Sequence, residues 1–133
     1  MDKAKIFIVD DEAEARESLA KYLERNLECE IAQAGDGRQA LEILKTNSFD
    51  VILLDIKMPG ISGLDVLKKT KVTHPNTDVL IISAWDSQPV AGETLETGAA
   101  DYIIKPSTIK VIFDKVCELL KKKDKCLPKV KTV

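Results

Sequence analysis

The chain alternates five short apolar runs with longer segments of helical periodicity, and this alternation restricts its fold more than any other feature. The runs span residues 6–9, 31–32, 51–54, 79–82 and 102–104. Three of them are continuously apolar and rich in β-branched residues, which is typical of strands buried on both faces of a parallel sheet. The run around residues 30–34 alternates polar and apolar side chains, as an edge strand does. We therefore predict a five-stranded parallel sheet.

The segments between the runs carry apolar residues at helical spacing. Leu19, Leu23 and Leu27 repeat at intervals of four, and a longer stripe of the same kind runs through residues 109–120. Ser62 and Ser107 stand where they are expected to cap the third and last helices. Strands that alternate with helices through short links predict an α/β fold, a (βα)5 doubly wound sheet with right-handed crossovers.

Length and cysteine content narrow the class of protein further. At 133 residues the chain predicts one domain. No apolar run approaches the ~18 residues that span a bilayer, and the first residues lack a secretory signal, so we expect no membrane contact. Cys29, Cys117 and Cys126 form no CxxC pair. A disulfide framework is therefore not expected, and a reducing cytoplasm fits the chain best.

The net charge of −2 conceals an asymmetry between the body of the chain and its end. Residues 121–133 hold six lysines and one aspartate, whereas residues 1–120 hold 14 basic and 21 acidic side chains. An acidic body argues against direct nucleic-acid binding, which needs a basic surface. We expect one domain over residues 1–120, followed by the Lys-rich end of the last helix and a solvated linker or tail over 121–133. Contact of this tail with DNA or an acidic partner is the alternative.

Polar residues follow four of the five apolar runs, at the points where the predicted strands end. Asp10 and Asp11 follow the first run, Asp55 the third, Ser83 the fourth and Lys105 the fifth. In a doubly wound sheet, ligands bind beyond the carboxyl ends of the strands, so these groups are expected to meet at one edge. No Gly-rich phosphate loop or dinucleotide fingerprint accompanies them.

Three carboxylates at one edge need a cation. Two carboxylates ~4 Å apart repel by about 4 kcal/mol at an effective dielectric constant of about 20. Hard oxygen ligands of this kind suit Mg²⁺. A cation beside a carboxylate, an amine and a hydroxyl predicts a site that handles phosphoryl groups, with the carboxylate as nucleophile.

Four sequence fragments carry a resemblance to a known family. They are Val-Asp-Asp-Glu at 9–12, Leu-Asp-Ile-Lys-Met-Pro-Gly at 54–60, Ile-Ser-Ala at 82–84 and Ile-Lys-Pro at 104–106. In this order and spacing they resemble the receiver domain of two-component response regulators, over residues 5 to about 120. The resemblance implies a flavodoxin-like (CheY-like) topology. The surrounding pattern is also similar to the N-terminal receivers of NtrC-like transcription activators.

The resemblance implies a role for each of the strand-end residues. Asp55 is expected to accept a phosphoryl group from a phosphohistidine of a sensor histidine kinase or a phosphotransfer protein. Asp10 and Asp11, together with Asp55 and the backbone carbonyl of Lys57, are expected to hold Mg²⁺. Lys105 is expected to pair with phosphoryl oxygens, and the peptide bond that follows it is expected to be cis.

Ser83 and Tyr102 are implied to be the switch of the domain. Ser83 is expected to move toward the phosphoryl group, and Tyr102 to turn inward behind it. The motion is expected to reshape the face formed by residues 90–97 and 102–116, where a partner or a second receiver docks. Such a protein phosphorylates and dephosphorylates itself but is not an enzyme on external substrates.

Two further residues are expected to set the lifetime of the phosphoryl group. Lys57 lies two positions after Asp55, and Trp85 lies two positions after Ser83. In the family, side chains at these positions flank the phosphoryl group. A lysine and a tryptophan hinder in-line attack by water, which predicts a long-lived phosphoaspartate.

Two other classes of protein remain as alternatives. A hydrolase of the haloacid-dehalogenase type also uses an aspartate nucleophile and Mg²⁺, but it needs Asp-x-Asp after its first strand, whereas Asp10 and Asp11 are adjacent here. A receiver-shaped module that only binds partners usually lacks an acidic residue or the lysine. Taken singly, the aspartates are typical of the start of a helix, Lys105 of a surface amine and Ser83 of a hydroxyl that caps a helix. Their joint placement at four strand ends favours the receiver.

Overall fold

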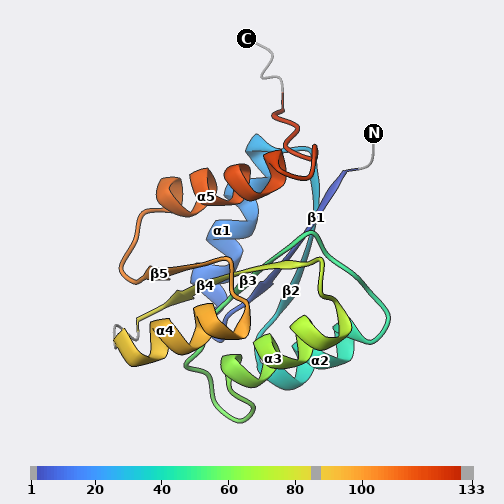
Figure 1. Ribbon diagram of the computed structural model, residues 1–133. Helices are drawn as coiled ribbons and strands as arrows, with labels where there is room; N and C mark the ends of the chain where they lie inside the picture. Colours follow the sequence, from blue (N-terminus) through green and yellow to red (C-terminus); the bar gives the residue numbers. More distant parts are fainter. Residues whose placement is uncertain (1–2, 85–87, 130–133) are drawn as a thin grey trace.

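The computed structural model describes residues 3–84 and 88–129, and it contains the predicted five-stranded parallel sheet (Figure 1). The strands lie side by side in the order β2-β1-β3-β4-β5. Their bounds are β1 Ala4–Val9, β2 Cys29–Ala34, β3 Val51–Leu54, β4 Asp78–Ser83 and β5 Asp101–Ile104. The weakly apolar strand β2 lies at an edge, as its alternating sequence predicts.

Each strand is followed by a helix, which confirms the predicted (βα)5 doubly wound fold. The helices are α1 Ala13–Asn26, α2 Gly37–Leu44, α3 Gly63–Thr73, α4 Gln88–Thr97 and α5 Ile109–Lys121. Helices α1 and α5 cover one face of the sheet, and α2, α3 and α4 cover the other (Figure 1).

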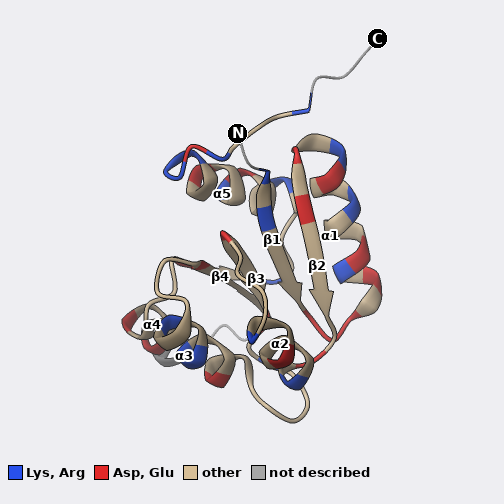
Figure 2. Cartoon of the chain, turned by 90° about the vertical axis from the view of Figure 1, so that its right-hand side faces the viewer, with Lys and Arg blue, Asp and Glu red and all other residues tan. Residues whose placement is uncertain are grey.

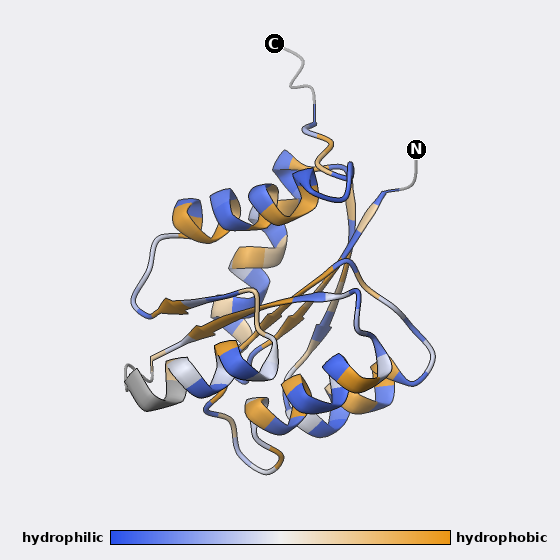
Figure 3. Cartoon of the chain, in the orientation of Figure 1, coloured by the Kyte–Doolittle hydropathy of each residue, from blue (hydrophilic) through white to orange (hydrophobic). Residues whose placement is uncertain are grey.

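Two apolar clusters form the core, one on each face of the sheet (Figure 3). Successive strand residues point to opposite faces. In β1, Ile6 and Ile8 therefore pack with α1 and α5, whereas Phe7 and Val9 pack with α2 and α3. Because both faces are covered, the central strands are apolar throughout, and burial of this surface is the main force that holds the sheet in place.

Helix starts follow the capping rules, with one correction to the prediction. The Ser62 hydroxyl accepts a hydrogen bond from the backbone N–H of Asp65 at 3.3 Å, so this predicted cap is confirmed. The predicted cap at Ser107 is wrong, because α5 begins at Ile109 and the capping residue is the one directly before it. Thr108 takes that role, and its hydroxyl accepts from the backbone N–H of Val111 at 3.2 Å.

The segment after α5 folds back onto the body of the protein. Lys125 Nζ lies 2.9 Å from Asp50 Oδ1, and Lys123 Nζ lies 3.6 Å from Asp78 Oδ2. Pro128 forms an antiparallel bridge with Leu27. Figure 2 shows this cationic segment next to the amino edge of the sheet, where the strands begin. The expectation of a wholly solvated tail therefore does not hold for this segment, because Lys123 and Lys125 find carboxylate partners within the domain.

Candidate phosphorylation site

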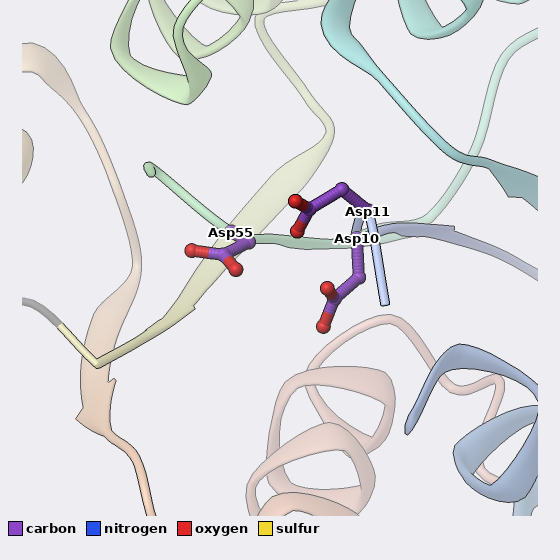
Figure 4. A group of neighbouring side chains, drawn as sticks. All are labelled: Asp10, Asp11 and Asp55. Atoms are coloured by element: carbon purple, nitrogen blue, oxygen red, sulfur yellow. The ribbon is translucent and has the colours of Figure 1, made fainter. Parts of the chain in front are cut away.

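Three aspartate side chains meet where strands β1 and β3 end. Asp10 directly follows β1 and Asp55 directly follows β3, and the two strands pair in parallel, so their ends lie next to each other. Ligand oxygens of Asp10, Asp11 and Asp55 lie within 4.8 Å of one another (Figure 4). Asp10 and Asp55 are buried, whereas Asp11 is exposed. The structure thus brings together the three carboxylates that the sequence places at this edge.

Lys105 connects two of these carboxylates. It follows β5, and its Nζ lies 2.8 Å from Asp10 Oδ2 and 3.4 Å from Asp55 Oδ2. Its backbone N–H donates to the carbonyl oxygen of Ser83 at 2.8 Å, which ties the ends of β4 and β5 together. The peptide bond between Lys105 and Pro106 is cis, as the resemblance implies.

The carboxyl group of Asp55 lies in an environment that disfavours its negative charge. Burial raises its pKa, and the nearby charge of Asp10 adds to that rise. Lys105, the backbone N–H of Lys57 at 3.1 Å and the hydroxyl of Ser83 work in the opposite direction, but the net pKa stays above the usual value. A poorly solvated carboxylate is a better nucleophile than one surrounded by water.

Lys105 keeps its charge despite partial burial. Burial alone would lower the pKa of its ammonium group, but the hydrogen bond to Asp10 and the charges of Asp55 and Asp10 raise it above the usual value. The site therefore holds a permanent cation at neutral pH, directly beside the Asp55 oxygens.

Arg16 is a residue of the site that the sequence analysis did not single out. Its Nη1 donates to the backbone carbonyl of Asp10 at 2.6 Å, and its Nε donates to Gln33 Oε1 at 3.1 Å. The guanidinium group of α1 thus fixes the turn after β1 against the end of β2. The signal in the sequence was an arginine about one and a half helical turns after the acidic pair, which is not specific by itself.

The loop after β3 packs very closely against the start of α3. A Cβ atom built at Gly63 would lie 2.2 Å from the carbonyl oxygen of Asp55, so only glycine allows this approach. The Gly63 backbone N–H donates to the carbonyl of Ile56 at 2.9 Å. This close approach and the hydrogen bond hold the backbone of Asp55 and Ile56 against the start of α3.

The other residues of the predicted switch and lifetime positions lie around this centre. Ser83 is buried at the end of β4, and Tyr102 in β5 is half-buried against the core cluster under α2 and α3. Lys57 is exposed next to Asp55. Trp85 lies outside the described residues.

The donor set at this site fits a divalent cation. Three carboxylates and one ammonium leave a formal charge of −2, and the carboxylates supply the hard oxygen atoms that Mg²⁺ prefers. A hollow of about 480 Å³ opens beside them and is lined by Asp11, Glu12, Asp55, Lys57 and Lys105, among other residues. This volume admits a phosphoryl group and part of its donor.

Among the described residues, no helix combines the length and the apolar character that crossing a bilayer requires.

Comparison with known proteins places this geometry in a family. The family model of the response regulator receiver domain matches residues 6–117. The transcriptional regulatory protein ZraR of Escherichia coli is 39% identical over 105 residues, which is 79% of this chain and 24% of that protein. Response regulator MprA of Mycolicibacterium vanbaalenii is 36% identical over 121 residues, which is 89% of this chain and 51% of that protein. A cyclic di-GMP phosphodiesterase of Thermotoga maritima is 30% identical over 116 residues, covering 87% and 31% of the two chains.

Solved structures give the same result. The receiver domain of Francisella response regulator 1452 superposes with a TM-score of 0.83 at 33% sequence identity, covering 91% of this chain and 99% of that one. A CheY-like receiver domain protein of Methanospirillum hungatei gives a TM-score of 0.87 at 27% identity, covering 93% and 98%. The chain spans about a quarter to a half of the curated relatives named above. It belongs to the response regulator receiver domains of two-component signal transduction.

Proposed function

We propose that Asp55 is the residue of this receiver that accepts the phosphoryl group, supplied by a sensor histidine kinase or a phosphotransfer protein. One observation carries the proposal. The Asp55 carboxylate interacts with the Lys105 ammonium, the Lys57 backbone N–H and the Ser83 hydroxyl. Asp55, Lys57 and Lys105 also line an open hollow. Phosphorylation on an aspartate is a general feature of the family.

The residues divide the chemistry between them. An Asp55 oxygen attacks phosphorus, a new O–P bond forms, and the N–P bond to the donor histidine breaks. Lys105 then balances the charge of the phosphoryl oxygens, and Ser83 donates a hydrogen bond to one of them. Asp10, Asp11, Asp55 and the backbone carbonyl of Lys57 would hold Mg²⁺. When bound, that ion neutralises negative charge on the phosphoryl group.

We propose that Ser83 and Tyr102 transmit the phosphorylation to the face made by α4, β5 and α5. Leu95, Ile104 and Val111 are large apolar side chains that stay exposed on these three elements. A phosphorylation-dependent homodimer, or a partner protein, would cover them. Typical allosteric coupling of ~1–3 kcal/mol corresponds to a shift of about 5- to 150-fold toward the active state.

Residues 1–120 would form the receiver unit of a longer cytoplasmic regulator, and the output of that regulator is transcriptional in this proposal. One of the named relatives, ZraR, is a transcriptional regulatory protein. The receiver itself would act as a switch that phosphorylates and dephosphorylates only itself. It would touch neither nucleic acid nor membrane directly.

We further propose a long phosphoryl lifetime, of minutes to hours. Lys57 lines the same hollow as Asp55 and offers no acceptor that would orient a hydrolytic water. Trp85 would add bulk on the other side. Each 1.4 kcal/mol of added barrier slows hydrolysis about tenfold. Faster decay after donor removal in Lys57→Asn and Trp85→Ala supports the proposal, whereas wild-type decay within seconds contradicts it.

The test of the acceptor uses acetyl phosphate, Mg²⁺ and intact mass spectrometry. We expect one added phosphoryl group on the wild type and none on Asp55→Asn. The matched control is Asp50→Asn, which removes the same charge at the amino edge and should still be phosphorylated. A phosphoryl gain that persists in Asp55→Asn would contradict the assignment.

Beryllofluoride, a phosphoryl mimic, separates the receiver from its alternatives. We expect Mg²⁺-dependent binding that is lost in Asp55→Asn, with chemical-shift changes over residues 90–97 and 102–116. Turnover of a generic phosphatase substrate would point to a hydrolase instead. Absence of binding would point to a module that only binds partners, and shifts confined to the loops around Asp55 would contradict the proposed switch face.

A further inference from the structure

The chain reverses direction directly after α5 through a Schellman turn. The backbone N–H of Lys125 donates to the carbonyl of Leu120 at 2.9 Å, and that of Asp124 donates to Lys121 at 3.2 Å. Asp124 has the left-handed conformation that this motif requires, with φ of 55°. The residues that follow therefore run back along the last turns of the helix instead of away from it.

This turn places a second cysteine against one in the helix. Cys117 lies on α5, one turn before Leu120, and Cys126 is the first residue beyond the turn. Both side chains are half-buried and pack against the cluster under α1 and α5, and the two thiols lie close enough to interact with each other. The sequence gives no hint of this pair, because the two cysteines form no CxxC motif.

Backbone contacts on both sides hold Cys126 in this position. The Glu28 N–H donates to the carbonyl of Leu127 at 2.8 Å, and the Lys129 N–H donates to Asn26 at 3.0 Å. Lys125 is fixed through its ion pair with Asp50. The contact between the thiols is thus part of a folded segment and not of a free end.

We propose that Cys117 and Cys126 are a redox modification site, at which a small-molecule disulfide converts the two thiols into an intramolecular disulfide that locks the segment after α5 onto the helix. In the reduced state the segment is held only by non-covalent contacts. In the oxidised state a covalent loop of ten residues joins it to α5.

The chemistry is a pair of thiol–disulfide exchanges. Cys126, as thiolate, attacks one sulfur of the small disulfide and releases a thiolate. Cys117 then loses its proton and attacks the Cys126 sulfur, which releases a second thiolate. Two electrons pass from the protein to the oxidant, and the two protein protons end on the two small thiols.

Cys126 is assigned the first attack because Cys117 holds its proton firmly. Burial, followed by the charge of Cys126 and the hydrogen bond with it, raises the pKa of the Cys117 thiol to about 12. Since the thiolate is the attacking species, Cys117 reacts only after its partner has been activated. We therefore expect slow oxidation that follows sustained exposure to the oxidant.

Cys29 supplies a matched control within the same chain. It opens β2, and its thiol donates to the carbonyl of Leu23 at 3.7 Å. Burial, with a contribution from Glu24, raises its pKa to about 11. It is thus also half-buried and protonated, but its thiol contacts a backbone carbonyl and not another thiol.

The experiment treats the full chain with glutathione disulfide and then alkylates the remaining thiols. We expect the wild type to lose about 2 Da and to retain one alkylatable thiol, on Cys29. Cys29→Ser should still lose about 2 Da and retain none. Cys117→Ser and Cys126→Ser should form no internal disulfide. Glutathione adducts without a mass loss, a disulfide that includes Cys29, or crosslinked dimers alone would overturn the proposal.

Hydrogen exchange measures whether the disulfide holds the segment after α5 more firmly on the helix. Closing a ten-residue loop corresponds to about a hundredfold slower opening of the enclosed segment. We therefore expect the Lys125 amide, which lies inside the loop, to exchange about a hundredfold more slowly in the oxidised protein, and unchanged exchange would overturn the lock. Phosphorylation of Asp55 at the opposite edge should proceed in both states, so this result stands or falls separately from the proposed acceptor.

Discussion

The two edges of the sheet carry the same types of charged residue, aspartate and lysine, but arrange them differently. At the carboxyl edge, three aspartates lie close together and Lys105 pairs with two of them, Asp10 and Asp55. At the amino edge, three aspartates at or before strand starts each have a lysine from α5 or the segment after it. These pairs are Asp50 with Lys125 at 2.9 Å, Asp78 with Lys123 at 3.6 Å and Asp101 with Lys115 at 2.9 Å.

The difference shows in the pKa values of one aspartate from each edge. Burial and Asp10 hold the pKa of Asp55 above its usual value, although Lys105 opposes them. Burial would also raise the pKa of Asp101, but its hydrogen bond to Lys115, with the Tyr102 N–H, brings it below the usual value. The amino edge therefore stabilises the fold, whereas the carboxyl edge keeps unbalanced charge available for a cation and a phosphoryl group.

The addition of Mg²⁺ is the test of this contrast with the largest expected effect. We expect about 2.7 kcal/mol of added stability at a concentration one hundred times the dissociation constant, because the ion binds the folded state only. Urea unfolding with and without Mg²⁺ measures the gain. It should shrink in Asp11→Ala more than in Asp10→Ala, since Asp10 already engages Lys105 and the Glu12 N–H. The Mg²⁺-dependent gain in stability should persist in Asp50→Asn. A gain in Asp11→Ala equal to that of the wild type would refute the assignment of the Mg²⁺ site to the carboxyl edge.

At the amino edge, Asp50→Ala should destabilise the protein by about 2 kcal/mol. The change removes the acceptor of the Lys5 backbone N–H at 2.8 Å and of Lys125 Nζ at 2.9 Å, and bonds to charged groups contribute about 1.5–3 kcal/mol. Chemical denaturation measures the loss. Asp11→Asn, an exposed charge at the other edge, is the control and should not destabilise. Equal effects of the two changes would show that the edges do not differ.

The pH dependence of stability should have opposite signs at the two edges in Mg²⁺-free buffer. Because the folded pKa of Asp55 is raised, its contribution is largest below the unfolded pKa of about 3.9 and is lost as pH rises through the folded value. The folded pKa of Asp101 is lowered, so its contribution is present above about 3.9 and is lost as pH falls.

Unfolding free energies of wild type, Asp55→Asn and Asp101→Asn across a pH series measure both contributions. The stability of the wild type relative to Asp55→Asn should fall with rising pH, with a slope of at most about 1.4 kcal/mol per pH unit for a single group. Relative to Asp101→Asn it should rise. If both stability differences changed with pH in the same direction, the proposed contrast between the two edges would be wrong.

The smallest expected effect concerns the turn at Asp124, which brings Lys125 to the amino edge. Asp124→Gly should stabilise the protein by about 0.5 kcal/mol, because glycine adopts a φ of 55° without the steric penalty of a side chain. Lys122→Gly is the control, since Lys122 has ordinary helical angles and gains nothing from glycine. Thermal unfolding compares the two, and a loss of stability in Asp124→Gly would contradict the role given to the turn.

The sheet and the clustering of polar residues at the strand ends could both be predicted from the sequence, and for the same reason. Parallel strands buried on both faces must be apolar throughout, so the first polar residue after each run marks where the strand ends. Asp10, Asp55 and Lys105 were found in this way. Helix α4 had no comparable apolar stripe, and it followed only from the repeating order of strands and helices.

The amino edge was missed although its acidic residues were equally visible. Asp50 precedes β3, and Asp78 and Asp101 open β4 and β5. The pairing of Asp50 with Lys125 depends on a reversal of the chain at Asp124, a non-glycine residue in a left-handed conformation, which the local sequence does not signal. The Ser107 cap failed for a related reason, because a shift of one residue in the helix start transfers the role to Thr108.

The fold-back after α5 also determines which domain boundary should be used when this receiver is fused to another protein. The match to the family model ends at residue 117, yet the partners of Asp50 and Asp78 are Lys125 and Lys123. A chimera joined at the similarity boundary would carry those two carboxylates without their counter-ions and the Leu27 edge without its neighbour. A junction beyond residue 129 would transfer the receiver together with the segment that completes it.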